Sequence, residues 1–362
     1  MKKKIFFFLP NFKSGGAGKS IYNLCKYLNK RKYDLFIISL GKNSYKRQLK
    51  KYCIKIFELD VKKTLFAFSY IIKILKANSS KNTLFISNIN YANVLTIFFL
   101  KILNSYKVAL IERTPLAELD ISYNVKDYIK KKVIKYLMFF FYKKADLVIS
   151  NSKYGCETLS KFTNSHGEFV YPLLDNKIKY KKKKTNKRFI KILTIGRLSE
   201  EKKIDLIIDT LKDTKDIDFE FIILGEGPLE TKLINKIGHD NSKIKILKYS
   251  KKREKFFLKN SDLYVNSSDF EGFPNSVVDA INYSVPVIAT KSHGGIYEIL
   301  GYGKNGFLFA QNNKSQLKSL IISYFKNRSI FEKKALLAHK NLKKFSPRES
   351  INKFERLIDK II

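Results

Sequence analysis

Two basic side chains follow an apolar run in the second half of the chain. The stretch "ILTIGRLSEEKKIDL" places Arg197 at the end of a strand-like segment and Lys202 five residues later. Further on, "EGFPNSVVDA" brings four residues, Gly272 to Asn275, in front of a segment with helical spacing. A helix N-terminus presents free N–H groups and the positive end of a dipole, and fixed positive charges strengthen its hold on an anion. These residues therefore predict a site for an anion such as a diphosphate.

Two carboxylates eight residues apart belong to the same stretch. Glu271 lies in the loop, and Asp279 falls in the first helical turn if the helix begins near Asn275. In that geometry both side chains face the site and can accept hydrogen bonds from sugar hydroxyl groups. The stretch therefore predicts recognition of a sugar next to the anion.

The segment "KSGGAGKS", Lys13 to Ser20, ends like a phosphate-binding loop of nucleoside triphosphatases. That pattern needs glycine at position 13, where Lys13 stands, and Gly15 and Gly16 come two or three residues too late. We interpret the segment as a glycine turn after the first strand. The alternative, an NTPase or kinase built on residues 13–20, predicts Mg²⁺-dependent binding of ATP or GTP that is lost in Lys19→Ala.

Apolar strand-like runs alternate with amphipathic stretches in both halves of the chain, which is typical of parallel sheets covered by helices. A basic stretch at about 176–188 interrupts the alternation and indicates a linker. We expect an α/β protein of two Rossmann-like domains, 1–175 and 176–362, facing across a cleft, with a last helix able to pack back on the first domain. Ligands of such sheets bind at the carboxyl ends of the strands.

Five short motifs follow one another in the second half: "GRLSEEKKIDLII", "LGEGP", "EGFPNSVVDA", "ATKSHGGIYEIL" and "NGFLF". Their order and spacing resemble those of the retaining GT-B glycosyltransferases of the family 4 group (glycosyl transferases group 1), which use nucleotide-activated sugars. The resemblance covers about residues 190–310 closely and the first half more loosely. It implies the GT-B fold, with an acceptor-side domain followed by a donor-binding domain.

The resemblance also implies roles for individual residues. Arg197 and Lys202 would hold the donor diphosphate and stabilise charge on the leaving group, and Glu271 would contact the donor sugar; these three are the implied catalytic residues. Gly225, in the Gly-Glu-Gly-Pro turn, either shapes the nucleotide pocket or contacts the nucleotide. The implied donor-binding residues are Gly15, Gly16, Arg197, Lys202, Gly225, Gly272, Phe273, Pro274, Asn275, Ser276 and Asp279.

The chain departs from the family pattern at three places. Asp279 stands where the family usually has a glutamate, and Gly18 stands where a glutamate follows the glycine pair. Glu112 and Arg113 stand in the loop where many relatives have a histidine near the reacting sugar. They are candidates for an acceptor or sugar site, and the other interpretation is a surface ion pair.

The implied reaction moves a hexose or N-acetylhexosamine from a nucleoside diphosphate sugar to an acceptor with retention of configuration. UDP-sugar is the first expectation and GDP-sugar the second, with a glycan or polyprenyl-linked glycan of cell-surface polysaccharide as acceptor. The leaving phosphate oxygen would help to remove the acceptor proton, so paired carboxylates of the glycosidase type are not needed. We expect no cofactor and no essential metal, because the three cysteines and four histidines show no metal-ligand spacing.

The formal charge of +39 raises the question of a polyanionic partner. Most basic residues are lysines rather than the arginines that nucleic-acid readers favour, and no nucleic-acid-binding motif is present, so we expect no nucleic acid. A diffuse lysine field suits an anionic membrane. The stretch Val125–Lys144 has the pattern of a basic amphipathic helix that lies in a membrane interface, although packing against its own sheet explains it equally well.

The chain has no run of about 18 apolar residues, the length that a spanning helix needs. We therefore expect a cytoplasmic protein that contacts the inner face of the cell membrane peripherally. A non-catalytic basic binding protein is the remaining alternative.

Overall fold

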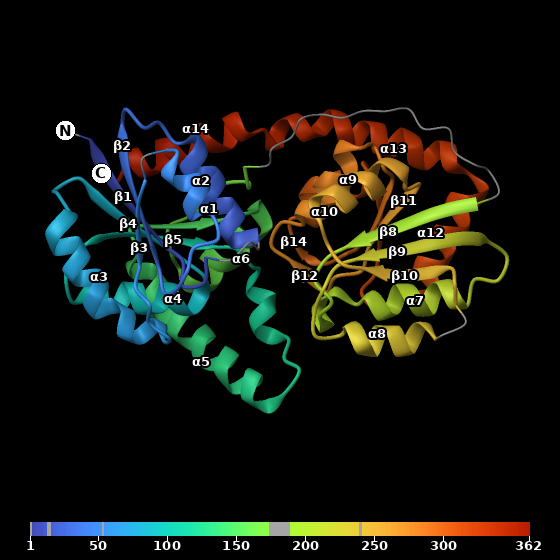
Figure 1. Ribbon diagram of the computed structural model, residues 1–362, viewed down its shortest axis with the longest axis horizontal. Coiled ribbons are helices and arrows are strands. Elements are labelled where there is room, and N and C mark those ends of the chain that lie inside the picture. Colours follow the sequence, from blue (N-terminus) through green and yellow to red (C-terminus); the bar gives the residue numbers. More distant parts are fainter. Residues whose placement is uncertain (1, 13–15, 53, 174–188, 239–240) are drawn as a thin grey trace. The chain divides into compact units, whose positions relative to one another are not determined.

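The computed structural model describes residues 2–12, 16–52, 54–173, 189–238 and 241–362 (Figure 1). The chain forms two compact units, Met1–Asp175 together with Phe345–Ile362, and Asn176–Lys344. Each unit has a parallel sheet with helices on both faces, as the alternation of apolar runs and helical stretches predicts. Within the described ranges, no helix has both the length and the apolar character to cross a membrane.

The sheet of the first unit has the strand order β3-β2-β1-β4-β5-β6-β7, and all its pairings are parallel. The order changes direction between β1 and β4, and sheets of this kind bind ligands beyond the carboxyl ends of their strands at such a point. The strands are β1 (Lys3–Phe8), β2 (Tyr33–Ser39), β3 (Lys55–Glu58), β4 (Thr83–Asn88), β5 (Lys107–Glu112), β6 (Leu147–Ser150) and β7 (Gly167–Phe169).

Alternate residues of β1 enter two different cores. Ile5 and Phe7 belong to the core that includes α1, whereas Phe6 and Phe8 belong to the core that includes α3 and α5. Burial on both faces explains why the first strand is a continuous apolar run. The helices of this unit are α1 (Gly16–Tyr27), α2 (Lys46–Lys50), α3 (Thr64–Asn78), α4 (Asn90–Thr96), η1 (Ile97–Ile102), η2 (Leu116–Asp120), α5 (Val125–Phe141), η3 (Tyr142–Lys144), α6 (Lys153–Thr163) and α14 (Pro347–Asp359).

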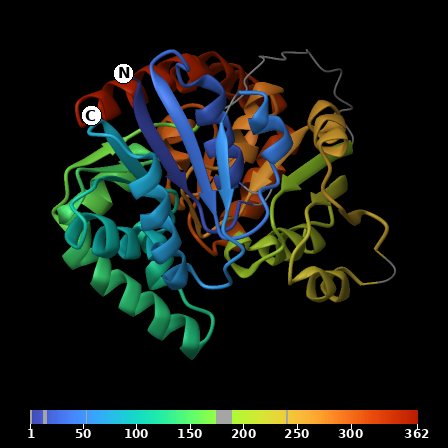
Figure 2. The same ribbon diagram turned by 60° about the vertical axis from the view of Figure 1, so that its left-hand side comes forward.

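The last helix, α14, completes the first unit although it comes from the other end of the chain. Phe354 and Ile358 are buried in the core beside α1. Asp359 accepts hydrogen bonds from Lys3 Nζ at 2.9 Å and from the Tyr33 hydroxyl at 2.8 Å. Figures 1 and 2 both show α14, in red, beside α1 and β1.

The second unit has a sheet of order β10-β9-β8-β11-β13-β15 and a separate pair, β12 with β14. Its strands are β8 (Phe189–Ile195), β9 (Asp218–Leu224), β10 (Ile244–Leu247), β11 (Leu263–Asn266), β12 (Phe270–Glu271), β13 (Val287–Thr290), β14 (His293–Gly294) and β15 (Phe307–Phe309). Its helices are η4 (Glu200–Lys202), α7 (Ile204–Lys212), α8 (Glu230–Ile237), α9 (Lys251–Asn260), α10 (Asn275–Asn282), α11 (Ile296–Ile299), η5 (Gly301–Gly303), α12 (Lys314–Lys326) and α13 (Arg328–Asn341), followed by η6 (Leu342–Phe345).

Candidate active site

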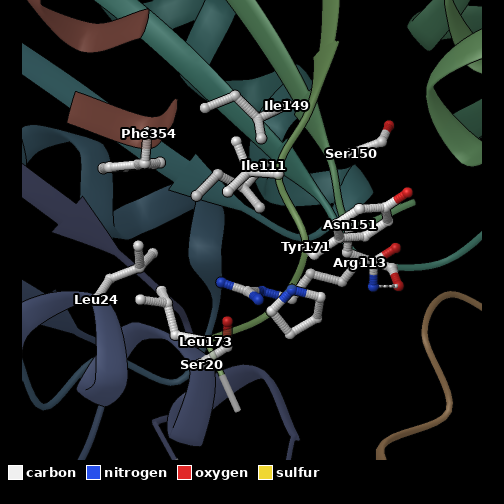
Figure 3. Close-up of a pocket in the computed structure, with 12 residues that line it drawn as sticks. Ser20, Leu24, Ile111, Arg113, Ile149, Ser150, Asn151, Tyr171, Leu173 and Phe354 are labelled. Atoms are coloured by element: carbon white, nitrogen blue, oxygen red, sulfur yellow. Dashed lines mark hydrogen bonds between the residues drawn. The ribbon is translucent and has the colours of Figure 1, made fainter. Parts of the chain in front are cut away.

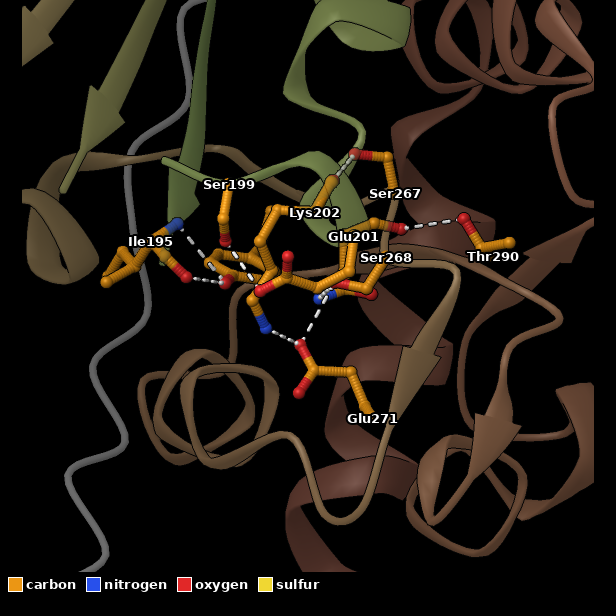
Figure 4. Close-up of polar contacts among 10 residues, drawn as sticks. Ile195, Ser199, Glu201, Lys202, Ser267, Ser268, Glu271 and Thr290 are labelled. Carbon is orange, nitrogen blue, oxygen red and sulfur yellow. Dashed lines mark hydrogen bonds and ion pairs between the residues drawn. The ribbon is translucent and has the colours of Figure 1, made fainter. Parts of the chain in front are cut away.

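The loop after β8 is hydrogen-bonded to the loop after β11, and β11 is the neighbour of β8 in the sheet. The Ser267 hydroxyl donates a hydrogen bond to the carbonyl oxygen of Lys202 at 2.7 Å (Figure 4). The Asp269 N–H donates to the carbonyl oxygen of Glu201 at 2.8 Å. The backbone that carries Lys202 is therefore held by contacts from a second strand end, which limits where its side chain can reach.

Lys202 and Glu271, which are 69 positions apart in the sequence, form an ion pair between Nζ and Oε1 (Figure 4). The hydroxyl of Ser268 donates to the same carboxylate oxygen at 3.0 Å. The two side chains keep only 21% and 16% of their surface exposed, so water screens the pair incompletely. The lysine stem also lies over Gly196, since its Cδ and Cε are 3.8 Å from where a Cβ would stand. A ligand anion arriving here would compete with Glu271 for the ammonium group.

Arg197 lies just after β8, in the same loop that leads to Lys202, and its side chain is exposed. Across the described part of the chain, its guanidinium has no hydrogen-bond or ion-pair partner. The Lys202–Glu271 pair is neutral overall, whereas the exposed charge of Arg197 is open to an incoming anion. The structure thus brings two of the three implied catalytic residues into contact and leaves the third free to meet an anion.

The Gly-Glu-Gly turn after β9 packs against the backbone of the Arg197 loop. A Cβ on Gly225 would lie 1.9 Å from the carbonyl oxygen of Gly196, and one on Gly227 would lie 2.3 Å from that of Leu198. The Leu198 N–H donates to the carbonyl oxygen of Glu226 at 3.0 Å. Both glycines are needed for this close backbone approach, which supports the interpretation of Gly225 as a residue that shapes the site.

Gly294 determines where Glu271 stands, a role that the sequence did not reveal. β12 and β14 pair in parallel with Glu271 opposite Gly294, and the Gly295 N–H donates to the carbonyl oxygen of Gly272 at 2.9 Å. Gly294 has a φ of +126°, and a Cβ there would lie 1.6 Å from the carbonyl oxygen of Glu271. Only glycine fits this position, for both conformational and steric reasons. The clue in the sequence is the glycine pair in "SHGGIYE".

Helix α10 begins at Asn275, one residue before the start at Ser276 that the sequence predicts, and Gly272, Phe273 and Pro274 are buried in front of it. The Asn275 Oδ1 atom is buried and has no hydrogen-bond partner among the described residues. The Ser276 side chain hydrogen-bonds to the buried Tyr264 hydroxyl, and burial raises the pKa of that phenol. Asn275 is therefore positioned to bind a ligand, whereas Ser276 already contacts the neighbouring strand.

Asp279 is the fifth residue of α10 and lies in its second turn, so the expected first-turn position is wrong. It hydrogen-bonds to Glu254 on α9, whose carboxylate also accepts from the Tyr249 hydroxyl at 2.9 Å and pairs with Lys251 Nζ at 2.5 Å. Burial opposes ionisation of Glu254, but the Lys251 hydrogen bond and charge, with the Asp279 and Tyr249 hydrogen bonds, lower its pKa overall. Sequence reasoning missed Glu254 and its partners Tyr249 and Lys251, since nothing in their spacing links them to Asp279.

Glu112, at the end of β5, is buried in a hydrogen-bond network in the first unit. Its Oε2 accepts from the Tyr142 hydroxyl at 2.8 Å and from Asn93 Nδ2 at 3.4 Å, and its Oε1 accepts from the Arg113 N–H at 3.3 Å. Burial raises the pKa of Glu112 to about 7, although the hydrogen bond from Tyr142 opposes this shift. The surface ion pair considered for Glu112 and Arg113 is wrong, because Glu112 is only 5% exposed and no ion pair joins the two side chains.

Arg113 points the other way and lines a small pocket with Ser20, Asn151 and Tyr171 (Figure 3). Its Nη2 donates to Asn88 Oδ1 at 2.7 Å, and its Nε is buried without a partner in the described structure. The residue after Asn88, Ile89, has a φ of +80°, which is unusual for a β-branched side chain. Strained backbone beside a half-buried arginine at the carboxyl edge of a sheet is typical of functional sites.

The glycine segment near the first strand is described only in part. Gly15 lies outside the described residues, and Gly16 is the first residue of α1, with no atom within 4 Å of where its Cβ would be. Gly18, Lys19 and Ser20 fall within the helix, and Gly18 is buried. The end of the triphosphatase-like pattern is thus helical.

Comparison with known proteins agrees with this geometry. Residues 175–344 match the family model described as Glycosyl transferases group 1. The chain is 32% identical over 206 residues to the uncharacterized glycosyltransferase MJ1178 of Methanocaldococcus jannaschii, across 56% of each chain. It is 28% identical over 201 residues to the Campylobacter jejuni N-acetylgalactosamine-N,N'-diacetylbacillosaminyl-diphospho-undecaprenol 4-alpha-N-acetylgalactosaminyltransferase, across 53% of this chain and 54% of the relative. The matching segments span about half the length of these curated relatives.

Solved structures extend the likeness to the whole chain. Anabaena Alr3699/HepE in complex with UDP and glucose matches with a TM-score of 0.79 at 17% identity, over 99% of this chain and 100% of that one. At this identity the likeness concerns the fold, and the two parallel α/β units have the GT-B fold of glycosyltransferases. The match to the family model described as Glycosyl transferases group 1 is confined to residues 175–344, within the second half of the chain.

Proposed function

We propose that the chain is a retaining glycosyltransferase that moves a hexose or N-acetylhexosamine from a UDP-sugar to a glycan or lipid-linked glycan. The observation that carries this proposal is the Lys202–Glu271 pair at the carboxyl edge of the second sheet, beside exposed Arg197. A basic group next to a carboxylate suits a ligand that joins a diphosphate to a sugar.

In this proposal each group has a separate task. Lys202 and Arg197 bind the diphosphate and stabilise the negative charge that grows on the leaving group. Glu271, released from Lys202, accepts hydrogen bonds from hydroxyl groups of the donor sugar. The N–H groups at the start of α10 bind the phosphates, and Asp279 binds the ribose hydroxyls. The leaving phosphate oxygen accepts the acceptor proton.

The nature of donor and acceptor is supported by the relatives. The HepE structure holds UDP and glucose. The Campylobacter relative is named as a transferase of N-acetylgalactosamine to a diphospho-undecaprenol-linked acceptor. By analogy we propose a lipid-linked acceptor that meets Arg113 in the first unit, where buried Glu112 holds the start of the Arg113 loop in place. The reaction would serve polysaccharide assembly at the cytoplasmic face of a membrane.

We also propose that the reaction needs no metal and no cofactor. Among the residues that the structure describes, no group of three histidine, cysteine or carboxylate side chains could hold a metal ion. The two cations, Lys202 and Arg197, would instead balance the diphosphate charge. We expect UDP binding and transfer to persist in EDTA.

Replacement of Lys202 by alanine tests the proposed site. We expect the transfer rate to fall by about 100-fold to 1,000-fold, as when one stabilising group for transition-state charge is removed. The assay follows release of UDP with a panel of UDP-sugars and lipid extracts as acceptors. Lys232→Ala, an exposed lysine of the same unit, is the matched control and should keep the wild-type rate.

Two outcomes would contradict the proposal. Transfer by Lys202→Ala at the wild-type rate would remove Lys202 from the site. Thermal stabilisation by ATP with Mg²⁺, lost in Lys19→Ala and absent with UDP, would favour the NTPase alternative instead.

A further inference from the structure

Helix α5 carries apolar side chains on two opposite sides. Ile134, Leu137, Met138 and Phe141 face the core of the first unit, yet Met138 is the only fully buried residue in this helix of 17 residues. Figure 2 shows α5 on the outside of its unit. Its other apolar side chains are exposed by 42% to 74%: Val125, Tyr128, Ile129, Val133, Tyr136, Phe139 and Phe140. Packing against the first unit therefore accounts for one side of this helix and leaves the apolar side chains of the other side exposed.

The exposed side chains form one continuous face. Val125, Ile129, Val133, Tyr136 and Phe140 are spaced by four, four, three and four residues, which places them along one side of a helix. The face continues onto α6, whose Phe162 ring lies 5.7 Å from that of Phe139, and this part of the face is a groove. Soluble domains rarely leave such a patch without a partner.

Lysines surround this face. Lys126, Lys130 and Lys132 of α5 are exposed, and none of them forms an ion pair within the described structure. Two further lysines, Lys131 and Lys135, are already paired with carboxylates at 3.0 and 2.5 Å. The whole chain has a net charge of +39, so a second copy would be repelled, whereas an anionic lipid surface would be attracted.

We propose that the outer face of α5, together with Phe162, binds the interface of an anionic membrane. The apolar side chains lie at the boundary of the acyl chains, and Lys126, Lys130 and Lys132 contact the lipid phosphates. This surface gives a structural basis to the membrane-side location on which the proposed function depends. Its test does not depend on that function, because vesicle binding needs neither donor nor acceptor.

The experiment is co-sedimentation of the full chain with vesicles of phosphatidylcholine, with and without phosphatidylglycerol. We expect the wild type to bind the anionic vesicles and to be released by salt. The variant Lys126→Gln/Lys130→Gln/Lys132→Gln should bind them on the order of 100-fold more weakly, from about a fivefold loss per lysine. Ile129→Gln/Val133→Gln/Phe140→Gln should lose at least as much, because the apolar area no longer enters the interface.

Matched controls lie in the second unit. Lys252→Gln/Lys255→Gln/Lys259→Gln removes the same charge from α9, and Ile234→Gln/Phe256→Gln removes exposed apolar side chains. Both controls should bind like the wild type.

Equal weakening by the α9 lysine variant, unchanged binding by the α5 variants or no binding by the wild type would overturn the proposal. Dimerisation that the α5 apolar variant abolishes would overturn it in favour of a second copy. If transfer fails but vesicle binding behaves as expected, only the proposed enzymatic function is wrong.

Discussion

At the scale of single residues, Glu271 in the second unit and Glu112 in the first unit differ in burial and in the partners of their carboxylates. Glu271 is partly exposed and paired with Lys202, so an incoming anion can release it. Glu112 is buried, with hydrogen-bond donors around it and no ion pair, which makes its ionisation costly. The first arrangement suits ligand exchange, whereas the second holds the start of the Arg113 loop in place.

Glu112→Gln should change how stability depends on pH. Burial raises the pKa of Glu112 from 4.5 to about 7, so the carboxyl is protonated in both states at low pH. Between these values the unfolded chain loses the proton first, and the free energy of unfolding declines by about 3 kcal/mol before it levels off above pH 7. The variant lacks this decline.

Urea unfolding of both proteins from pH 4.5 to 8 measures the effect. The difference between wild type and variant should shift with pH in favour of the variant and stay constant above pH 7. Parallel stability curves over the whole range would show that Glu112 ionises normally.

At the scale of secondary-structure elements, the short pair β12–β14 holds the loop that carries Glu271. We expect Gly294→Ala to lower transfer activity strongly and to destabilise the second unit by several kcal/mol, because the new methyl group meets the Glu271 carbonyl oxygen and the φ of +126° is strained. Gly303→Ala is the matched control, since Gly303 also has a positive φ (+92°) but open space around it.

Transfer rates and thermal unfolding of the two variants separate the causes. Gly303→Ala should lose only about 1 kcal/mol, from backbone strain alone, and keep its activity. If both variants lose the same stability and activity, the contact with Glu271 has no special role.

Elements were easier to predict than their contacts. The start of α10 at Asn275 could be predicted to within one residue. A loop with glycine and proline ends the preceding strand, and apolar residues with the helical period of 3.6 follow it. The position of Asp279 in the second turn, and its neighbour Glu254, could not. That contact joins two helices and depends on how both lie against the sheet.

At the scale of the whole molecule, the C-terminal helix α14 packs into the first unit, which is formed mainly by the N-terminal half of the chain. Phe354 is 1% exposed in the core of the first unit. We expect Phe354→Ala to lower the free energy of unfolding of this unit by about 3–5 kcal/mol, through lost burial and the cavity left behind.

Chemical unfolding followed by tyrosine fluorescence measures this effect. Arg356→Ala, at an exposed position of the same helix, should change stability by no more than about 0.5 kcal/mol. A small effect of Phe354→Ala would mean that α14 is not needed for the first unit.

The sequence by itself determined the parallel α/β class, the approximate site of the linker and the residue types that could bind a diphosphate and a sugar. These follow from local patterns: apolar runs on strands, glycines in turns and charges just after strands. Only the tertiary structure decided which side chains meet. Lys202 reaches Glu271 because β8 and β11 are neighbours in the sheet, and Tyr142 reaches Glu112 because η3 follows a helix that packs beside β4 and β5. Strand order and helix packing depend on contacts between residues that are far apart in the sequence. Local sequence patterns do not reveal these contacts.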